Sequence, residues 1–508
     1  MLSRGLALCA FIQALVLLGS CRGPQFASRT TDQSPTISPA NAVISVDDEP
    51  IIEDTTETAL PEDEETSAED LAAEAEMNQM DEWDLLTQQI GHADGDVAAP
   101  GLVPPTGLEL AVQDDAHFIT IDSAKRSAAL DEANNLGASY VRVNAIWIRK
   151  GSDPVDFPKD PCASGVSSRI HDMPCIYSLI TEAQKRPTPV SVQLTLTALP
   201  VQKKDCRTGD KLDEREPAEY AHFVTEAIKT FCPLGVTRYS FFNEPDLGGI
   251  RTCLPKGTSS AAHYRKLYLA GYNAARRAAK SINATCNPSH LRLLIGELSS
   301  DQNRSMDWLY QVVKNHKMKA SGLALHPYQF NSDPANKDSV YPYGIGSLSR
   351  TLNRLADFKT HGWLMTRGGA ILPLYLTEFG YRRDKEMCCT SYCGSGPHCK
   401  PYKPYPPASE MCSGMCVGCP LDLHKKGVSM CLPEPLRGSY LTKSLDIALS
   451  EVGHGVRQPL YFHLYPDAPT HPGTWDSSII NNDPVDPYSP SYLALHGWAC
   501  THGYMVCP

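Results

Sequence analysis

The chain has 508 residues, of which 42% are hydrophobic and 20% are charged, so it is long enough to build one large core or two ordinary ones. Its formal net charge of −12 leaves no surplus of basic side chains to neutralise phosphates, which excludes nucleic acid as the expected partner. A neutral or weakly charged substrate is expected instead.

The first 21 residues have the pattern of an export signal. Arg4 supplies a positive charge, and the apolar run ALCAFIQALVLL is too short to span a bilayer comfortably. The run ends in LLGSC, which resembles the lipobox of bacterial lipoproteins, with Cys21 as the residue that would carry lipid. We therefore predict an exported protein, either a bacterial cell-surface lipoprotein attached to the membrane through Cys21 or a secreted protein with an ordinary signal peptide.

The segment from residue 22 to residue 105 is acidic, as in EDTTETALPEDEETSAEDLAAEAE. It lacks the apolar content that would offset the entropy of ordering, so we predict a disordered tether. A short helix over residues 69–90 is compatible with this composition and is not expected to change the role of the tether.

From residue 106 onward, short β-rich runs alternate with stretches of helical periodicity. The β-rich runs are LELAV, YVRV, VSVQLTL, RYSFF, LRLLI, GLAL, LYLT and LYFHL. Segments between them, such as AEYAHFVTEAIKTF, carry apolar residues at three- and four-residue spacing, as helices with one buried face do. Strands that alternate with helices pair in parallel, and eight such units predict an α/β fold of the (β/α)8 TIM-barrel type over residues 106–508.

Cysteines are concentrated in one part of this region. The chain has 18 cysteines, and an even sixteen remain when Cys9 and Cys21 are set aside, which suits disulfides in an oxidising compartment. Eight of them lie in a predicted cysteine-rich insertion, residues 386–432, that follows the seventh strand. Such a segment buries little apolar surface, so it needs covalent cross-links or a bound metal to hold a defined structure.

Disulfides are the favoured staples for this insertion in an exported chain. The alternative is a zinc site, because three cysteines have ligand-like spacing and a histidine lies near them. These residues are Cys412, Cys416, Cys419 and His398.

Two of the predicted strands end in a carboxylate. YSFFNEPD places Glu244 at the end of the fourth strand, and LYLTEFGY places Glu378 at the end of the seventh. The C-terminal ends of the strands form the working face of a barrel, so the two side chains are expected to face each other across its mouth. Glycoside hydrolysis requires such a pair: one carboxylic acid protonates the leaving oxygen, and the other carboxylate attacks the anomeric carbon or activates water there.

With these residues the chain resembles the clan A glycoside hydrolases, which are (β/α)8 barrels with an acid/base Glu after strand four and a nucleophilic Glu after strand seven. The resemblance covers residues 108–498. It implies that Glu244 is the acid/base and that Glu378 forms the glycosyl-enzyme intermediate. FFNEPD matches the clan's Asn-Glu-Pro, which implies that Asn243 bonds the sugar 2-hydroxyl.

Two further strand ends carry the same resemblance. LHPYQ, after the sixth strand, looks like the clan's His-x-Tyr, which implies that Tyr328 bonds the nucleophile and that His326 lines the sugar site. Arg142, in YVRVN at the second strand, matches a clan arginine that holds the nucleophile ionised.

Each of these residues also has a structural alternative. Glu244 and Glu378 could be rim carboxylates paired with basic residues, Arg142 a structural ion-pair partner and His326 an interior histidine. Glu297, in LIGELSS at the end of the fifth strand, is a third rim carboxylate, for which sugar binding and a structural salt bridge are equally compatible with the sequence.

Aromatic platforms for sugar rings are expected around the mouth. Many clan members carry a Trp at the end of strand eight, whereas this chain reads FHLYPD there. We assign the platform to Trp475, in the loop beyond, with ordinary packing as the alternative.

We therefore expect an exported retaining glycoside hydrolase that cleaves β-linked polysaccharides or oligosaccharides, with endo cleavage favoured. No cofactor and no metal are expected, and the insertion is expected to shape substrate access. The alternative of a different class is a non-catalytic carbohydrate-binding or adhesion protein on a decayed barrel. A metal-dependent hydrolase is a third possibility, against which the chain has no HExxH-like pair.

Overall fold

The computed structural model describes several parts of the chain, all of them within one compact unit that spans residues 65–508. The described residues are 68–88, 107–146, 173–197, 217–247, 258–299, 304–329, 333–335, 343–381, 434–465, 477–481 and 487–507.

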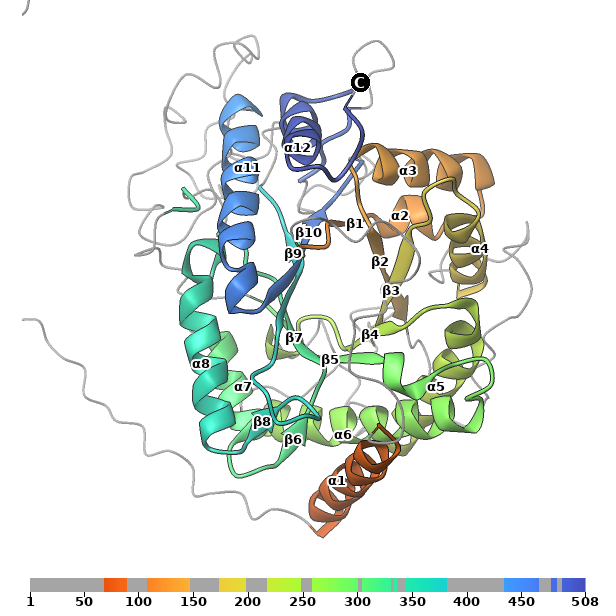
Figure 1. Cartoon of the computed structure of the whole chain (residues 1–508), viewed down its shortest axis with the longest axis vertical. Helices are drawn as coiled ribbons and strands as arrows, with labels where there is room; N and C mark the ends of the chain where they lie inside the picture. Colours follow the sequence, from red (N-terminus) through yellow and green to blue (C-terminus); the bar gives the residue numbers. More distant parts are fainter. Residues whose placement is uncertain are drawn as a thin grey trace, which may run out of the picture. The chain divides into compact units, whose positions relative to one another are not determined.

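Eight parallel strands form a closed barrel, viewed along its axis in Figure 1. In chain order they are β1 (Ala111–Gln113), β2 (Tyr140–Ile146), β3 (Ser191–Thr197), β4 (Arg238–Phe241), β5 (Arg292–Leu298), β7 (Gly322–Leu325), β9 (Leu374–Phe379) and β10 (Val456–Phe462). Each strand pairs with the next of these, and β10 pairs with β1, which closes the ring. The predicted TIM barrel is confirmed, and each of the eight β-rich runs overlaps one of these strands.

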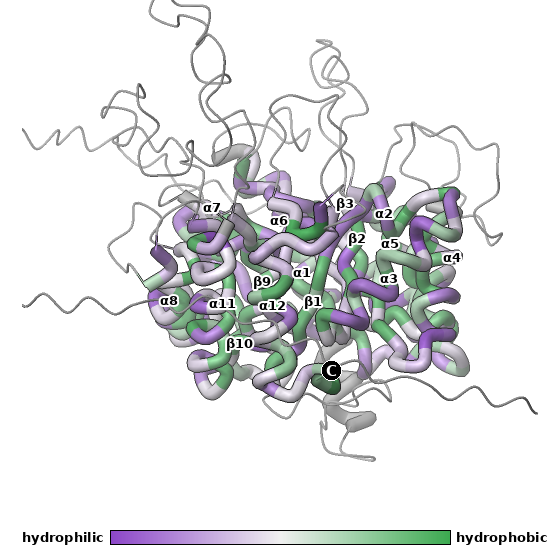
Figure 2. The backbone as a smooth tube through the Cα atoms, turned by 90° about the horizontal axis from the view of Figure 1, so that it is seen from above, coloured by the Kyte–Doolittle hydropathy of each residue, from purple (hydrophilic) through white to green (hydrophobic). Residues whose placement is uncertain are grey.

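Helices surround the barrel (Figure 1). They are α3 (Ser123–Asn135), α4 (Met173–Gln184), α5 (Pro217–Phe231), α6 (Thr258–Ser281), α7 (Arg304–Val313), α8 (Leu348–Thr360), α11 (Glu434–Ser450) and α12 (Pro490–Thr501). In α5 the buried residues recur every three or four positions, from Tyr220 and Phe223 to Phe231, so one face packs on the strands. Figure 2 shows the corresponding changes between purple and green along these helices.

Shorter elements complete the barrel. One-turn helix α2 (Asp115–Phe118) directly follows β1, and strands β6 (Met318–Lys319) and β8 (Leu364–Met365) form a separate two-stranded sheet. The 3-10 helices are η1 (Cys232–Leu234), η2 (Pro245–Leu247), η3 (Pro288–His290), η4 (Ile345–Ser347) and η5 (Val452–His454). Of these, α2 and η2 lie at the C-terminal ends of strands, where they position side chains discussed below.

Helix α1 (Ala68–Gln88) lies inside the segment for which we predicted a tether. Its Asp70 and Glu74 are buried: Asp70 lies 3.7 Å from the guanidinium of Arg265, and Glu74 bonds the ring of His316. The helix therefore packs against α6 and the end of α7, which composition alone did not indicate. The rest of residues 22–105 and the export signal lie outside the described residues. No helix in the described parts is long and apolar enough to cross a membrane.

Two disulfides join pairs of described residues. Cys232 bonds Cys286, which links the ends of α5 and α6, and Cys500 bonds Cys507 near the C-terminus. The oxidised cysteines that we predicted are confirmed at these positions. The insertion over residues 386–432, with its alternative zinc ligands, lies outside the described residues.

Candidate active site

Seven polar side chains converge at the C-terminal ends of the barrel strands. They are Arg142 on β2, Asn243 and Glu244 after β4, Glu297 on β5, His326 and Tyr328 after β7, and Glu378 on β9. Seven site residues were predicted from the sequence, and six of them belong to this group, which also contains Glu297. The seventh, Trp475, lies outside the described residues.

The two carboxylates that we predicted to act together are close neighbours. An oxygen of Glu244, an oxygen of Glu378 and a ring nitrogen of His326 all lie within 4.8 Å of one another. The side chain of Glu244 is 17% exposed and that of Glu378 is 9% exposed. Carboxyl groups about 5 to 5.5 Å apart suit attack by one of them on a sugar, whereas about 6.5 to 9.5 Å would be needed to hold a water between them.

A fully buried arginine holds one member of this pair. Arg142 donates from Nη1 to Oε1 of Glu378 at 2.6 Å and from Nη2 to Oδ1 of Asn243 at 2.8 Å. It also donates from Nε to Oε1 of Glu297 at 3.0 Å. Burial works against its charge, but Glu297 and Glu378 outweigh burial and raise the pKa of Arg142 overall. Arg142 is therefore a permanent cation between two carboxylates.

Glu297 forms a buried ion pair with this arginine. Both of its oxygens bond Arg142, and Oε1 also accepts hydrogen bonds from Thr195 at 2.8 Å and from Ser240. Burial alone would raise the pKa of Glu297, but the charge of Arg142 lowers it to about 2. Of the two alternatives left open by the sequence, the structure favours the salt bridge.

His326 is the second cation of the site. Its Nδ1 lies 3.2 Å from Oε1 of Glu244 and 3.5 Å from Oε2 of Glu378. Burial alone would lower the pKa of His326, but Glu378, with Glu244 and Glu297, raises it to about 10. The ring is therefore protonated at neutral pH.

Tyr328 completes the environment of Glu378. Its hydroxyl donates to Oε2 of Glu378 at 3.1 Å, while Arg142 holds Oε1. Burial and the charge of Glu378 raise the pKa of Tyr328 well above its usual range, so the hydroxyl stays protonated and remains a donor. Glu378 is thus fixed at both oxygens.

The cluster has one more carboxylate than it has cations, so one added proton would balance its charge. Three carboxylates, those of Glu244, Glu297 and Glu378, face the two cations Arg142 and His326. The cluster becomes neutral when one carboxylate is protonated. Glu297 is held ionised, with its pKa at about 2, and Glu378 is bonded by Arg142. Glu244 is the most exposed of the three, so a proton carried there is accessible to a ligand in the mouth.

The backbone at the mouth has an unusual conformation. Phe242, Glu244 and Glu297 have φ angles of 66°, 47° and 53°, in the left-handed region that L-residues rarely adopt. Each such residue costs on the order of 1–3 kcal/mol and persists only where the surroundings enforce it. Here the N–H of Glu244 donates to the carbonyl oxygen of Glu297 at 2.9 Å, which ties the two strand ends together.

Asp246, in η2, anchors the turn that follows Glu244. Its carboxylate accepts hydrogen bonds from the N–H of Ser299 at 3.0 Å, from the hydroxyl of Ser299 at 2.7 Å and from that of Ser305 at 2.7 Å. Burial raises the pKa of Asp246 to about 6, although the serine hydrogen bonds oppose this. Asp246 was not among the site residues predicted from the sequence, although it lies two residues after Glu244 in FFNEPD.

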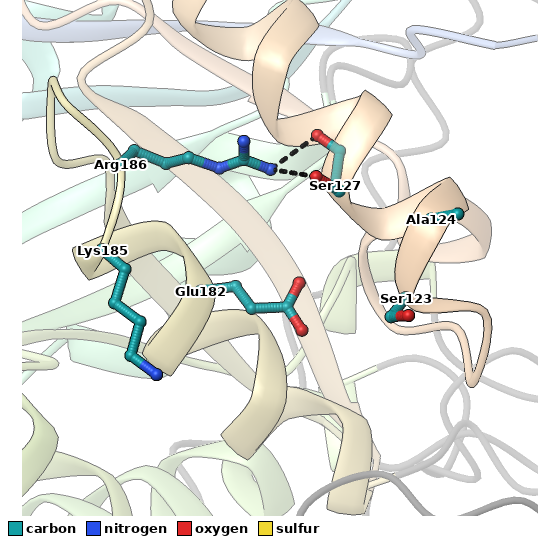
Figure 3. Close-up of a pocket in the computed structure, with 6 residues that line it drawn as sticks. All are labelled: Ser123, Ala124, Ser127, Glu182, Lys185 and Arg186. Carbon is teal, nitrogen blue, oxygen red and sulfur yellow. Dashed lines mark hydrogen bonds between the residues drawn. The ribbon is translucent and has the colours of Figure 1, made fainter. Parts of the chain in front are cut away.

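A surface depression lies elsewhere, between α3 and α4 (Figure 3). It measures about 490 Å³, and its lining includes Glu182, Lys185 and Arg186. Arg186 donates to the backbone oxygen and the hydroxyl of Ser127, and Glu182 pairs with Arg126. These groups satisfy one another on the outer helix layer, so the depression does not compete with the barrel mouth as a site of chemistry.

The chain matches no protein-family model and no curated protein. It is similar to solved structures of glycoside hydrolases. A family 39 glycoside hydrolase from Bacteroides cellulosilyticus WH2 has 13% identity and a TM-score of 0.44, over 78% of this chain and 64% of that one. A monomeric beta-xylosidase from Caulobacter crescentus CB15 has 16% identity and a TM-score of 0.45, over 78% and 69%.

A fungal beta-1,4-galactanase is also similar, at 14% identity and a TM-score of 0.43, over 77% of this chain and 98% of that one. The chain spans less than two thirds of the family 39 enzyme. At these identities the likeness concerns the fold alone.

Proposed function

We propose that the protein is a retaining glycoside hydrolase that cleaves β-glycosidic bonds by double displacement. The observation that carries this proposal is the pairing of Glu244 with Glu378, in which one carboxyl oxygen of each residue lies within 4.8 Å of the other. One carboxylate is fixed by Arg142 and Tyr328, while the other is more exposed and faces His326. Two carboxyl groups with distinct environments are what separate acid and nucleophile roles require.

In the first step Glu378 attacks the anomeric carbon of the bound sugar. A bond forms between a Glu378 oxygen and this carbon, and the bond from carbon to the leaving oxygen breaks. Glu244 gives its proton to the leaving oxygen and becomes a carboxylate. The protonated ring of His326, 3.2 Å from Glu244, stabilises the negative charge that appears there.

In the second step water releases the sugar. Glu378 is now an ester and carries no charge, so Glu244 can act as the base and take a proton from water. The water oxygen bonds the anomeric carbon, and the carboxylate of Glu378 leaves. Arg142, at 2.6 Å from this carboxylate, stabilises the charge that returns to it.

The proposal also includes the export of the protein, the type of substrate and the role of the insertion. Export, with or without lipid on Cys21, is supported by the apolar run and the LLGSC motif. The substrate is a β-linked carbohydrate, with endo cleavage of a polysaccharide favoured, and the insertion at residues 386–432 is proposed to shape its access because it follows the strand that carries Glu378.

The test compares the wild type with Glu244→Gln and Glu378→Gln on aryl β-glycosides and a polysaccharide panel. We expect Glu378→Gln to be inactive on every substrate. Glu244→Gln should still form the glycosyl-enzyme from aryl glycosides whose leaving group needs no proton, but it should release the sugar slowly, because Glu244 is also the base of the second step. Glu182→Gln, in the surface depression, is the matched control and should behave as the wild type. A wild-type protein that binds glycans and cleaves none would favour the binding-protein alternative.

A further inference from the structure

We propose that Asn144 and Asp115 form a binding site for two sugar hydroxyls at the rim of the barrel, beside the catalytic pair. This inference rests on the proposed function and deepens it, since it assigns a substrate class to the same mouth. The ligand is the glycone of a neutral glycoside with two adjacent free hydroxyls.

The first observation is an unsatisfied buried acceptor on Asn144. This residue lies on β2, is only 9% exposed, and donates from Nδ2 to Oδ2 of Asp115 at 2.7 Å. Because a carboxylate only accepts, the amide nitrogen must face Asp115, which turns Oδ1 of Asn144 away. That oxygen is buried and has no hydrogen-bond partner among the residues that the structure describes. Buried polar atoms without a partner are uncommon in folded proteins, and a ligand that donates a hydrogen bond would satisfy this one.

The second observation is the position of Asn144 relative to the catalytic pair. Asn144 follows Arg142 by two residues on the same strand, so both side chains point into the barrel. One repeat of the strand pleat places Asn144 roughly 6.6 Å nearer the mouth. Arg142 bonds Glu378 directly, so a sugar held over Glu378 has ring hydroxyls within reach of Asn144. Asp115 also contributes to the raised pKa of Arg142, which agrees with its nearness.

The third observation is that the chain around Asp115 is held in place. The neighbouring Asp114 accepts hydrogen bonds from the ring of His117 at 2.8 Å and from the N–H of Tyr465, after β10, at 2.8 Å. The rings of His117 and Tyr465 stack with centroids 4.1 Å apart. Asp114 thus ties the end of β1 to the end of β10, and Asp115 bonds the N–H of Asn144 on β2 at 3.3 Å. Asp115 is part of a fixed rim.

The chemistry of the two acceptors selects the ligand. Oδ1 of Asn144 and the carboxylate of Asp115 both accept hydrogen bonds, so the ligand must donate twice. Adjacent sugar hydroxyls do this, whereas the carboxylate of a uronic acid or a sugar phosphate would be repelled by Asp115. The site therefore favours neutral glycones with a free vicinal diol over acidic ones.

The experiment measures kcat and KM for the wild type, Asn144→Ala, Asp115→Asn and the control Asn135→Ala. Asn135 also points its amide at a carboxylate, that of Glu132, but on the exposed face of α3. The substrates are a neutral aryl β-glycoside, its monodeoxy series and the matching uronide. We expect Asn144→Ala to lower kcat/KM on the parent by about 10- to 100-fold. On one monodeoxy substrate the loss should nearly vanish, because the missing hydroxyl removes the same contact.

The remaining outcomes are also decisive. An equal loss on the parent and on every deoxy substrate, or preference for the uronide, overturns the inference while the proposed function stands. If the wild type cleaves nothing, NMR titration with the free neutral sugar is the deciding measurement. Weaker binding by Asn144→Ala than by the wild type then supports the sugar-binding inference and refutes only the proposed catalytic function. Absence of both binding and cleavage refutes both. Should Asn144→Ala not fold by circular dichroism, Asn144→Ser, which is smaller and polar, replaces it.

Discussion

The two ends of the barrel each bury an arginine, and they surround it differently. At the floor, Arg238 donates to Glu109 at 2.6 Å and to Gln458 at 3.1 Å, and its guanidinium lies 3.9 Å from the ring centroid of Tyr140. At the mouth, Arg142 meets two carboxylates, and a third lies nearby beside a protonated histidine. One acid balances the floor arginine, whereas the mouth holds an excess of acids.

The backbone shows the same difference. Among the described residues, four other than glycine have a positive φ, and three of them lie at the mouth. None belongs to the floor layer around Arg238. A buried arginine is therefore no sign of function by itself, because a paired and stacked one is simply a satisfied interior charge. The excess of carboxylates, together with strained backbone, distinguishes the end for which we propose chemistry.

The largest expected effect comes from removing one acid at each end. Glu378→Gln should lower kcat by about 10⁴-fold or more, because the nucleophile is lost. Glu109→Gln should leave kcat unchanged and lower the free energy of unfolding by about 1–3 kcal/mol, since it weakens a part-buried charge-assisted hydrogen bond. Hydrolysis rates measure the effect on kcat, and urea unfolding measures the effect on the free energy of unfolding. Equal loss of activity in both variants would remove the distinction between mouth and floor.

Replacing the two arginines by lysine is the next test. Lysine keeps the charge but cannot donate to several acceptors at once, so Arg142→Lys should lower kcat/KM by about 10²-fold as Glu378, Glu297 and Asn243 lose their common donor. Arg238→Lys should affect only stability. An Arg142→Lys variant with normal activity would show that the arrangement of donors is not needed.

The pH dependence of stability should reflect the mouth. The pKa of Glu297 is lowered from 4.5 to about 2, so its contribution is present above pH 4.5 and is lost as the pH falls toward 2. The pKa of His326 is raised from 6.5 to about 10, so its contribution is present below pH 6.5 and is lost as the pH rises toward 10. Urea unfolding of wild type, Glu297→Gln and His326→Gln at several pH values should show the acid decline reduced in the first variant and the alkaline decline reduced in the second. Unaltered declines would contradict these assignments.

A smaller effect is expected at the turn after β4. Asp246→Asn should lower kcat by about 10-fold with little change in KM, because one serine hydrogen bond is lost and Glu244 shifts. Asp333→Asn, which breaks the part-exposed pair with Lys443 at 2.6 Å, is the control and should leave both constants unchanged. A change in KM alone would mean that Asp246 acts on binding rather than on the position of the acid.

The sequence was sufficient to predict the barrel and six residues that lie together at its mouth. Each strand is a short apolar run, and Glu244 and Glu378 stand directly at strand ends, so local pattern and strand order together place them. The role of Glu297 was not predictable in this way, because it depends on Arg142 reaching across the barrel from β2 to β5. The partner of a buried charged side chain is therefore set by the closed barrel, which brings distant strands together.

The same limit applies elsewhere in the chain. The acidic composition of residues 22–105 gave no sign that Asp70 and Glu74 would be buried against Arg265 and His316, since such pairing depends on basic residues about 200 positions away. Asn144 and Asp115 were not predicted as site residues for a related reason. Their contact joins the ends of two strands, and neither residue lies in a recognisable motif.

The most direct test of the central claim is to trap the covalent intermediate. A 2-deoxy-2-fluoro glycoside with a good leaving group should label the enzyme once, and peptide mapping by mass spectrometry should locate the sugar on Glu378. Arg142→Lys should be labelled more slowly at the same residue. A label on Glu244 or Glu297, or turnover of ordinary substrates with no label on Glu378, would contradict the account.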